Sequence, residues 1–395
     1  VAVGDCVGGT SDYQQQRERS AHSHAQRNDP GVDPLQLRHG YYNGKHQRGG
    51  RYVSHGVGDQ CPEHRDPTRE AELFRARRDR ARQRGVAPDL IEDVLRRTIR
   101  DSYAAQEERF GSTGPLDRPV VIVGGSGAFG RCLGGFFRRS GYRVREIERA
   151  DWNDAATICE RASAVIVSVP IDRTVEVIGR LPALPDDCVL ADVTSVKQAP
   201  LAAMLERHSG PVVGLHPMFG PDVRSLAKQV VVVCPGRASG NGRWLLDQFV
   251  LWGATLREET PRDHDRAMAT IQAMRHFSTT VYGAFLERTG ADLDELLRLS
   301  SPIYRLELAM VGRLFAQNPE LYADIMLSAR ELGELAETYR EAFDELHAHV
   351  REGRREEIVA FFERARSWFG PRAEDLLHES GDLLRKAHDA RDPQA

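Results

Sequence analysis

The feature that most constrains this chain is a run of apolar residues followed by regularly spaced glycines. Residues 120–123 read Val-Val-Ile-Val, which is typical of a buried β-strand. Gly125, Gly127 and Gly130 follow with the spacing G-x-G-x-x-G, and apolar residues then recur at helical spacing as far as Phe137. A strand, a glycine turn and an amphipathic helix in this order indicate the first half of a βαβ unit that binds a dinucleotide.

Each glycine of this motif has an expected task. Gly125 permits the tight turn, Gly127 lets the backbone approach a pyrophosphate, and Gly130 lets the helix pack closely against the strand. The free N–H groups of the helix start, at Ala128 and Phe129, would face the phosphates. The alternative is a glycine turn in an α/β domain that binds no nucleotide.

An acidic residue after the second strand indicates which dinucleotide is bound. Residues 143–147 are predicted to form that strand, and Glu148 follows it about 20 residues after the glycines. An acid at this place binds the ribose hydroxyls and repels a 2′-phosphate. The sequence therefore favours NAD over NADP, although Arg149 next to Glu148 weakens this preference.

Length, charge and cysteines limit the class of protein. A chain of 395 residues is long enough for two or three domains. A net charge of −4 gives no reason to expect nucleic acid or an anionic membrane as partner. No apolar run approaches the length of a membrane span, and the six cysteines show no C-x-x-C spacing. We expect a cytoplasmic protein with reduced thiols and no metal site.

The first part of the chain differs from the rest. Residues 1–65 contain two leucines and no Ile, Phe, Met or Trp, which predicts disorder because too little apolar surface could be buried. The histidines in this part lack a ligand spacing, so we do not expect them to bind a metal. From Asp66 the pattern becomes helical, with helices expected over 67–84 and 88–108.

Two polar residues lie on the apolar face of the helix over 88–108. Ser102 and Gln106 follow Leu95 and Ile99 on that face. They either meet water near the helix end or line a polar pocket between helices, and the pattern alone does not decide between these interpretations.

The middle of the chain continues the α/β pattern. Apolar strands are expected at residues 164–169, 188–193, 211–215 and 229–234, and they alternate with helical stretches. This alternation predicts a mostly parallel, doubly wound sheet over residues 118–260, with ligands at the carboxyl ends of the strands.

Three polar residues follow the ends of these strands. Ser195, Lys197 and His216 should therefore point into one crevice beside the nicotinamide. His216 lies in a turn flanked by proline and glycine and is the candidate acid/base, because imidazole titrates near neutral pH. The alternative for His216 is a purely structural histidine.

From about residue 261 the pattern is helical only. Helices are expected over 262–289, 291–316, 318–351 and 354–368, which predicts an all-α second domain over 261–375 that closes the substrate site and forms dimers. Within it, Arg305 and Arg313 lie on a mostly apolar helix. They either pair with an acid such as Glu307 or bind an anionic substrate. His276 is a packing histidine or a site residue, and both interpretations stay open.

Several stretches resemble one enzyme family. They read RPVVIVGG, VIVSVPI, SVK, GLHPMFGPD and SSPIYRLELAMVGR, and they resemble the bifunctional chorismate mutase–prephenate dehydrogenases (T-proteins) of enteric-type bacteria. The resemblance extends from about residue 66 to beyond residue 370. It implies a homodimeric, NAD-dependent dehydrogenase that decarboxylates prephenate to 4-hydroxyphenylpyruvate in tyrosine biosynthesis, with tyrosine as feedback inhibitor.

The resemblance also implies roles for individual residues. His216 matches the histidine that hydrogen-bonds the substrate 4-hydroxyl, and Ser195 matches a serine that orients this histidine and the substrate. Arg313 matches the arginine that holds a prephenate carboxylate, with Arg305 a further substrate-binding candidate on the same helix. His276 matches a histidine tied to tyrosine inhibition, and Lys197 is assigned to the wall of the site.

The segment 66–111 resembles the second half of the helical chorismate mutase domain. Asp66, Glu70, Ser102 and Gln106 match its active-site positions, which would make chorismate a second substrate. The long first helix of that family should precede Asp66, but residues 1–65 show neither its apolar repeat nor its cation spacing. We therefore expect little mutase activity and a frameshift or mistranslated start upstream of Asp66, which resequencing of the gene would test.

Two other functions remain as alternatives. One is a dehydrogenase of the same fold with another substrate, such as arogenate. The other is a dimeric NAD-binding regulatory protein without turnover.

Overall fold

A computed structural model gives the fold of part of the chain. It describes residues 67–88, 90–92, 94, 95, 98, 110–237 and 242–389. The expectations for residues 1–65, Asp66, Ser102 and Gln106 lie outside these residues, and only the backbone of Glu70 is described. The described residues belong to one compact unit.

The first described helix is α2 (Pro67–Gln83), at the place that the sequence predicts. Proline suits the first position of a helix because its missing N–H is not needed there. Phe74 and Ala81 are the buried apolar residues of this segment. The chain leaves the helix at Gly85, whose φ of +69° lies in the left-handed region that glycine adopts without strain.

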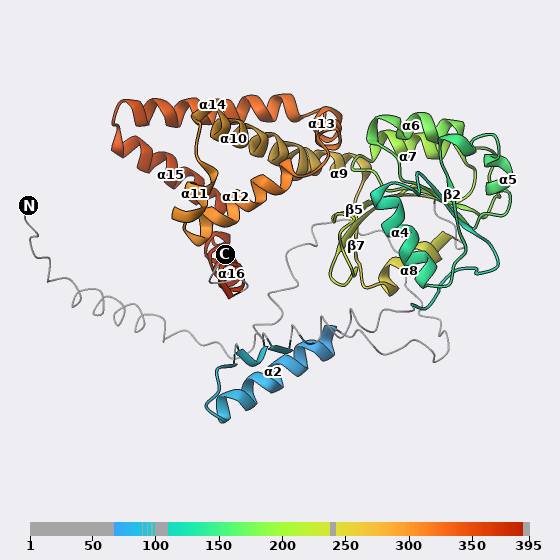
Figure 1. Cartoon of the computed structure of the whole chain (residues 1–395), viewed down its shortest axis with the longest axis horizontal. Coiled ribbons are helices and arrows are strands. Elements are labelled where there is room, and N and C mark those ends of the chain that lie inside the picture. The colour runs from blue at the N-terminus through green and yellow to red at the C-terminus, as the bar shows by residue number, and fades with distance from the viewer. Residues whose placement is uncertain are drawn as a thin grey trace, which may run out of the picture. The chain divides into compact units, whose positions relative to one another are not determined.

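A seven-stranded sheet follows (Figure 1). Its order is β2-β1-β3-β4-β5-β6-β7, and of the neighbouring pairs only β5 and β6 run antiparallel. The mostly parallel, doubly wound sheet is confirmed. The strands are β1 (Val120–Val123), β2 (Val144–Ile147), β3 (Ala164–Val167), β4 (Val189–Asp192), β5 (Val212–Pro217), β6 (Val230–Pro235) and β7 (Thr255–Glu258). The strand β7 was not predicted, because its residues Thr-Leu-Arg-Glu form a short, partly exposed edge strand without an apolar run.

Helices cover both faces of this sheet. Side chains of β1 alternate between two cores: Val120 and Ile122 join one, and Val121 and Val123 join the other. The first core contains side chains of α4 (Ala128–Arg139) and α8 (Arg243–Leu251). The second contains side chains of α5 (Ala155–Cys159), α6 (Ile171–Arg180) and α7 (Gln198–Arg207). Burial on both faces explains why these strands are continuously apolar.

The position of His216 differs from the prediction. The strand expected over 211–215 extends to Pro217, so His216 lies within β5 and pairs with Val232 of the antiparallel strand β6. The ladder with β6 is the physical reason for the extension, because it supplies partners for backbone groups that a loop would expose. His216 is consequently 2% exposed and held by a rigid sheet.

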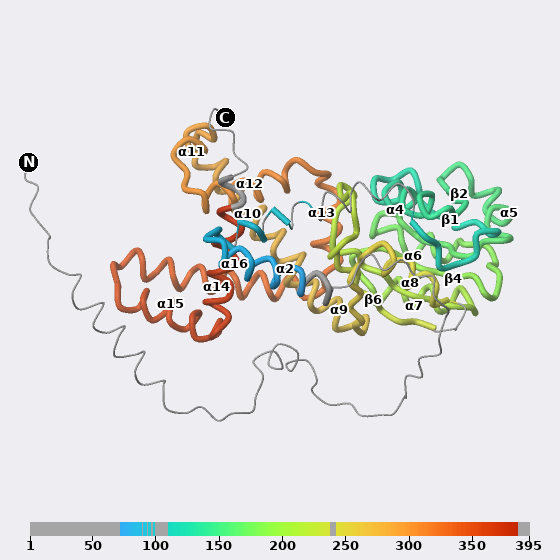
Figure 2. The backbone as a smooth tube through the Cα atoms, turned by 90° about the horizontal axis from the view of Figure 1, so that it is seen from below, coloured from blue at the N-terminus to red at the C-terminus, as the bar shows by residue number. Residues whose placement is uncertain are grey.

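After β7 the chain is helical (Figure 2). The helices are α9 (Pro261–Met268), the π-helix η4 (Ala269–Met274), α10 (Arg275–Thr289), α11 (Leu293–Leu299), α12 (Pro302–Phe315), α13 (Pro319–Ser328), α14 (Leu332–Arg351), α15 (Arg355–Phe369) and α16 (Arg372–Asp389). None of the described helices combines the length and apolarity needed to cross a membrane.

Three of the four predicted long helices are interrupted. The stretch 291–316 breaks before Pro302, where the Ser301 hydroxyl accepts the N–H of Tyr304 and caps a new helix. The stretch 318–351 breaks between α13 and α14, and 262–289 contains the π-helix. Apolar periodicity alone does not reveal a break between two helices when the apolar residues of both continue the same helical pattern.

Candidate active site

The predicted dinucleotide site is a pocket at the carboxyl ends of β1, β2 and β3. Its cavity has a volume of about 440 Å³. Gly127 and Glu148, both predicted to contact the cofactor, line it together with Ser126 and Arg149. The Glu148 carboxylate accepts the backbone N–H of Ser126 at 2.6 Å, so this acid is fixed beside the glycine turn.

The glycines of the turn have partly different tasks from those predicted. The residue with positive φ is Gly124, at +80°, so the tight turn depends on Gly124 rather than on Gly125. At Gly125 a Cβ would lie 2.4 Å from Glu146 Cγ. At Gly130 a Cβ would lie 2.4 Å from the carbonyl oxygen of Gly124, which confirms the close approach of helix and turn.

The remaining predicted cofactor residues begin the helix α4. Gly127 is its N-cap and makes no side-chain cap hydrogen bond, so no side chain of the cap residue covers the first N–H groups of the helix. Ala128 and Phe129 are the first two helical residues and do not line the pocket. The Phe129 ring instead contacts the Phe219 ring, with centroids 5.9 Å apart, in the loop after β5.

His216 is one member of a chain of hydrogen bonds between the sheet and the helices after it. His216 Nδ1 lies 2.8 Å from His264 Nε2, and His264 Nδ1 lies 2.8 Å from Asp265 Oδ1. On the other side of the ring, His216 Nε2 lies 3.1 Å from the amide Nε2 of Gln272. Asp265, His264, His216 and Gln272 therefore form a continuous series.

The acid at the end of this series fixes where its protons lie. A carboxylate can only accept, so His264 Nδ1 carries a proton that it donates to Asp265. With both rings neutral, His264 Nε2 then accepts from His216 Nδ1, and His216 Nε2 is left as an acceptor. The Gln272 amide donates to this nitrogen.

The charge state of the series follows from its surroundings. Burial raises the pKa of Asp265, but hydrogen bonds from His264 and from the backbone N–H groups of Gln198 and Lys197 lower it more, so its pKa falls below the ordinary value. Burial lowers the pKa of His216 well below 6.5, and repulsion from a proton on His264, when that ring carries one, and from the charge of Lys197 lowers this pKa further. His216 is thus a neutral base near pH 7.

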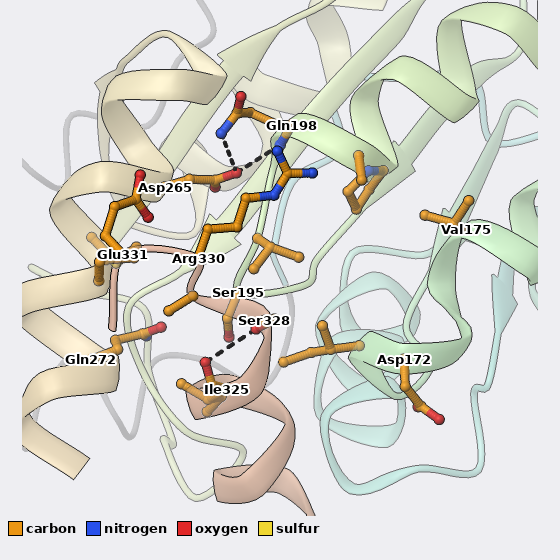
Figure 3. A pocket seen from close by; sticks show the side chains of 17 residues that line it. Asp172, Val175, Ser195, Gln198, Asp265, Gln272, Ile325, Ser328, Arg330 and Glu331 are labelled. Atoms are coloured by element: carbon orange, nitrogen blue, oxygen red, sulfur yellow. Dashed lines mark hydrogen bonds between the residues drawn. The ribbon is translucent and has the colours of Figure 1, made fainter. Parts of the chain in front are cut away.

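A second pocket lies next to His216 (Figure 3). Its cavity has a volume of about 230 Å³, and Ser195, Asp265 and Gln272 line it. His216 itself does not line this pocket, but Gln272, which does, contacts His216 Nε2 and so connects the two. The opposite walls come from α6 and from the link between α13 and α14, where Arg330 extends into the pocket.

Lys197 is not where the sequence analysis expected it. Its side chain is completely buried, and its ammonium group donates to the Asp192 carboxylate and to the Leu215 carbonyl oxygen, the latter at 2.8 Å. Lys197 therefore does not point into the crevice. The anion that holds this ammonium is the carboxylate of Asp192, the last residue of β4, rather than a ligand.

Arg313 and Arg305 have different partners. Arg313 donates to the Asp222 carboxylate at 3.1 Å, in an exposed ion pair that joins α12 to the loop after β5. The acid is therefore Asp222 rather than Glu307. Arg305 donates to the Leu297 carbonyl oxygen at 3.3 Å, which ties the start of α12 to α11, and it does not line the pocket beside His216.

His276 is a buried residue at the start of α10. Its ring contacts Tyr322 of α13 edge to face, with centroids 4.7 Å apart, and burial and Arg275 lower its pKa to about 4. His276 does not line the pocket beside His216. His276 Nδ1 also accepts a hydrogen bond from the Arg275 guanidinium group at 3.3 Å, so the described partners of this ring are side chains of the protein itself.

Sequence reasoning missed His264, Asp265 and Gln272. A signal was present, because His264, Met268 and Gln272 recur every fourth residue on the buried side of one helical stretch. The pattern is the one that singles out Ser102 and Gln106, namely polar residues on an apolar helix face.

Comparisons with known proteins agree with this architecture. Residues 143–251 match the family model described as the nucleotide-binding domain of prephenate dehydrogenase, and residues 260–364 match the model of its dimerization domain. A protein named T-protein from Enterobacter agglomerans is 51% identical over 326 residues, covering 82% of this chain and 87% of the relative. The T-protein of Haemophilus influenzae is 48% identical over 328 residues, with the same coverage of both chains.

A more distant relative differs in the substrate that its name states. The 4-amino-4-deoxyprephenate dehydrogenase of Streptomyces pristinaespiralis is 28% identical over 293 residues, covering 68% of this chain and 97% of the relative. That name describes a substrate with an amino group in place of the hydroxyl group at carbon 4.

Proposed function

The chain belongs to the T-protein family, and from this we propose that it is an NAD-dependent prephenate dehydrogenase of tyrosine biosynthesis. The reaction converts prephenate and NAD⁺ to 4-hydroxyphenylpyruvate, CO₂ and NADH. The observation that carries the proposal is the unprotonated Nε2 of His216, fixed by His264 and Asp265 next to a pocket of about 230 Å³.

The reaction makes one main demand on the protein. The hydrogen at C4 leaves as a hydride, with the electron pair of the C4–H bond. The ring carboxylate leaves as CO₂, and the electron pair of the broken bond between the ring and this carboxylate completes the aromatic ring. Positive charge develops at C4 while this happens, and the 4-hydroxyl oxygen delocalises it. The 4-hydroxyl would take the place of the Gln272 N–H at His216 Nε2 and donate a hydrogen bond there, which stabilises that charge, and the phenol product retains the proton.

The residues of the glycine turn fit NAD. When bound, NAD supplies the hydride acceptor. The absence of a side chain at Gly127 leaves the start of α4 open, and Glu148 lies in the pocket wall where it would bind the ribose hydroxyls. A 2′-phosphate would meet the same carboxylate, which supports NAD rather than NADP.

The substrate carries two carboxylates, and we assign Arg313 to one of them. Its guanidinium group is exposed and held by Asp222 on the loop after His216, so the ion pair positions it without burying it. Ser195 lines the pocket beside Gln272 and would orient the substrate. The described contacts of Lys197 and Arg305 favour structural roles for these two residues.

The test is NADH formation, followed by absorbance, with prephenate and NAD. We expect turnover by the wild type and a loss of about 10²- to 10³-fold in kcat for His216→Asn, because losing one preorganised hydrogen-bonding group at a developing charge costs about that much. His208→Asn is the matched control, since His208 is also buried but bonds the Cys188 carbonyl oxygen instead. Equal losses in both variants would contradict the role of His216.

Two assays distinguish the alternatives. Oxidation of arogenate with a higher kcat/KM than prephenate would assign the other substrate to the same fold. Binding of NAD and prephenate without NADH formation would favour a regulatory protein.

We also propose a homodimer that tyrosine inhibits. The helices after β7 expose large apolar side chains, which supports a covered surface in solution. Examples are Leu327, Phe343, Phe362 and Trp368. Analytical ultracentrifugation and inhibition by tyrosine test these statements. Of the residues that match chorismate mutase, Asp66, Ser102 and Gln106 lie outside the described part, and only the backbone of Glu70 is described. We keep the expectation of little mutase turnover, which an assay with chorismate tests.

A further inference from the structure

Gln272 occupies an unusual place beside His216. It belongs to η4, the π-helical turn between α9 and α10, a type of distortion that often marks functional sites. Its amide Nε2 lies 3.1 Å from His216 Nε2, and its side chain lines the adjoining pocket. Its Oε1 is buried and has no hydrogen-bond partner among the described residues.

The orientation of this amide is not free. The Asp265 carboxylate sets the proton on His264, which leaves an acceptor at His216 Nε2. An acceptor requires a donor opposite, so the NH₂ end of Gln272 faces the histidine and the oxygen end faces away. The negative charge of Asp265 thus determines, through two imidazoles, that Gln272 offers N–H groups at the reacting position.

We propose that Gln272 determines specificity for the substituent at carbon 4 of the substrate ring, selecting a hydroxyl group over an amino group. The inference rests on the proposed function, in which that substituent contacts His216. No covalent step beyond the proposed reaction is involved.

The selection follows from counting donors and acceptors. A hydroxyl group donates one hydrogen bond and accepts others, so by displacing the Gln272 N–H from His216 Nε2 it can donate to that nitrogen and accept from the freed Gln272 Nε2. An alkyl amine is protonated near neutral pH and has three donors and no acceptor. Its ammonium would point a donor at the N–H groups of Gln272. A site built for one pattern rejects the other because buried polar groups are left unpaired.

The unpartnered oxygen of Gln272 completes the argument. Gln272 Oε1 is the acceptor that an amine would need, and in the structure it is turned away from His216. Gln272→Glu replaces the amide nitrogen by a second oxygen, so both terminal atoms of the side chain accept hydrogen bonds while its volume is almost unchanged. Gln272→Leu removes both donor and acceptor. The two variants therefore separate the hydrogen-bond pattern from side-chain size.

The experiment compares kcat/KM for prephenate with kcat/KM for 4-amino-4-deoxyprephenate, the substrate in the name of the Streptomyces relative. The ratio of the two values cancels the amount of folded enzyme. We expect Gln272→Leu to lower the ratio about 10-fold, the effect of one lost hydrogen bond, and Gln272→Glu to lower it about 100-fold. Val175→Glu is the control, because it places a carboxylate on the α6 wall of the same pocket.

Each outcome decides the matter. A ratio that falls in both Gln272 variants, and falls further in Gln272→Glu than in Val175→Glu, supports the inference. Ratios within about threefold of the wild type, or an equal fall in Val175→Glu and Gln272→Glu, overturn it while the proposed function stands. A wild type that forms no NADH with prephenate shows that the proposed function has failed, and the inference falls with it.

Discussion

Replacing His264 by leucine tests how strongly the hydrogen bond between His264 and His216 determines which nitrogen of His216 carries the proton. In the wild type, His264 accepts from His216 Nδ1 at 2.8 Å, and its side chain is fully buried. Leucine has a similar volume but no acceptor. A proton on His216 Nδ1 then has no hydrogen-bond acceptor. The Gln272 amide can reverse, so that its unpartnered oxygen accepts a hydrogen bond from a proton on His216 Nε2. The base becomes a donor.

The magnitude follows from the cost of an unpaired buried group. Leaving the His216 Nδ1 proton without an acceptor costs about 1–3 kcal/mol. Since about 1.4 kcal/mol corresponds to a factor of ten, the population of the productive tautomer should fall about 10- to 100-fold. We expect kcat for prephenate oxidation to fall by the same factor, with a smaller change in KM, because the substrate carboxylates bind elsewhere.

Two measurements check this prediction. NADH formation gives kcat, and nitrogen NMR of the His216 ring reports which nitrogen carries the proton. His208→Leu is the control, since it also removes a buried imidazole hydrogen bond but lies outside the site. A His264→Leu enzyme with a kcat within threefold of the wild type and an unchanged tautomer would refute the reasoning.

Other substitutions and conditions test the rest of the structure. Lys197→Met should lower the free energy of unfolding by about 3–5 kcal/mol in urea titrations, because it leaves the Asp192 carboxylate buried without its cation; a loss below about 1 kcal/mol would contradict this. Gly130→Ala should weaken NAD binding more than about 10-fold in calorimetry, since its Cβ would lie 2.4 Å from the Gly124 carbonyl oxygen; unchanged affinity would show that the turn can adjust. His276 has a pKa of about 4 in the folded protein, below its ordinary 6.5. As the pH falls, this imidazole is therefore protonated in the unfolded chain before it is protonated in the folded protein. Stability should therefore decline between pH 6.5 and 4, by roughly 3 kcal/mol at pH 4 from this residue, and His276→Gln should decline less in urea titrations over the same pH range.

The sequence predicts the sheet well because its signals are local. The apolar runs of β1, β3 and β4 are continuous since both faces of these strands are buried, and the glycine spacing identifies the turn before α4. The buried strand β5 is predicted at its correct place, but the predicted strand ends at residue 215, two residues before the observed end. Its extension depends on pairing with β6, which no local pattern announces.

The candidate site is less predictable because it depends on contacts between distant residues. His216 was found from its position after an apolar run, but its partner His264 comes from a helix 48 residues later. Lys197 was misplaced because its burial depends on Asp192, and a lysine near a strand end normally faces solvent. The π-helical turn was missed because apolar spacing does not distinguish it from an α-helix over so few residues.

That turn has a consequence for the rotational phase of the helix. His264 and His276 are twelve residues apart, which in an uninterrupted α-helix would place them about 120° out of phase. The extra residue that a π turn holds removes about 100° of that difference, so one composite helix presents His264 to the sheet and His276 to α13 from nearly the same side. The number of residues between His264 and His276, rather than the identity of the side chains between them, thus allows both histidines to reach their partners. Deleting one residue between 269 and 274 would restore a regular helix and turn one histidine away from its partner, so this stretch should tolerate substitutions better than a single deletion.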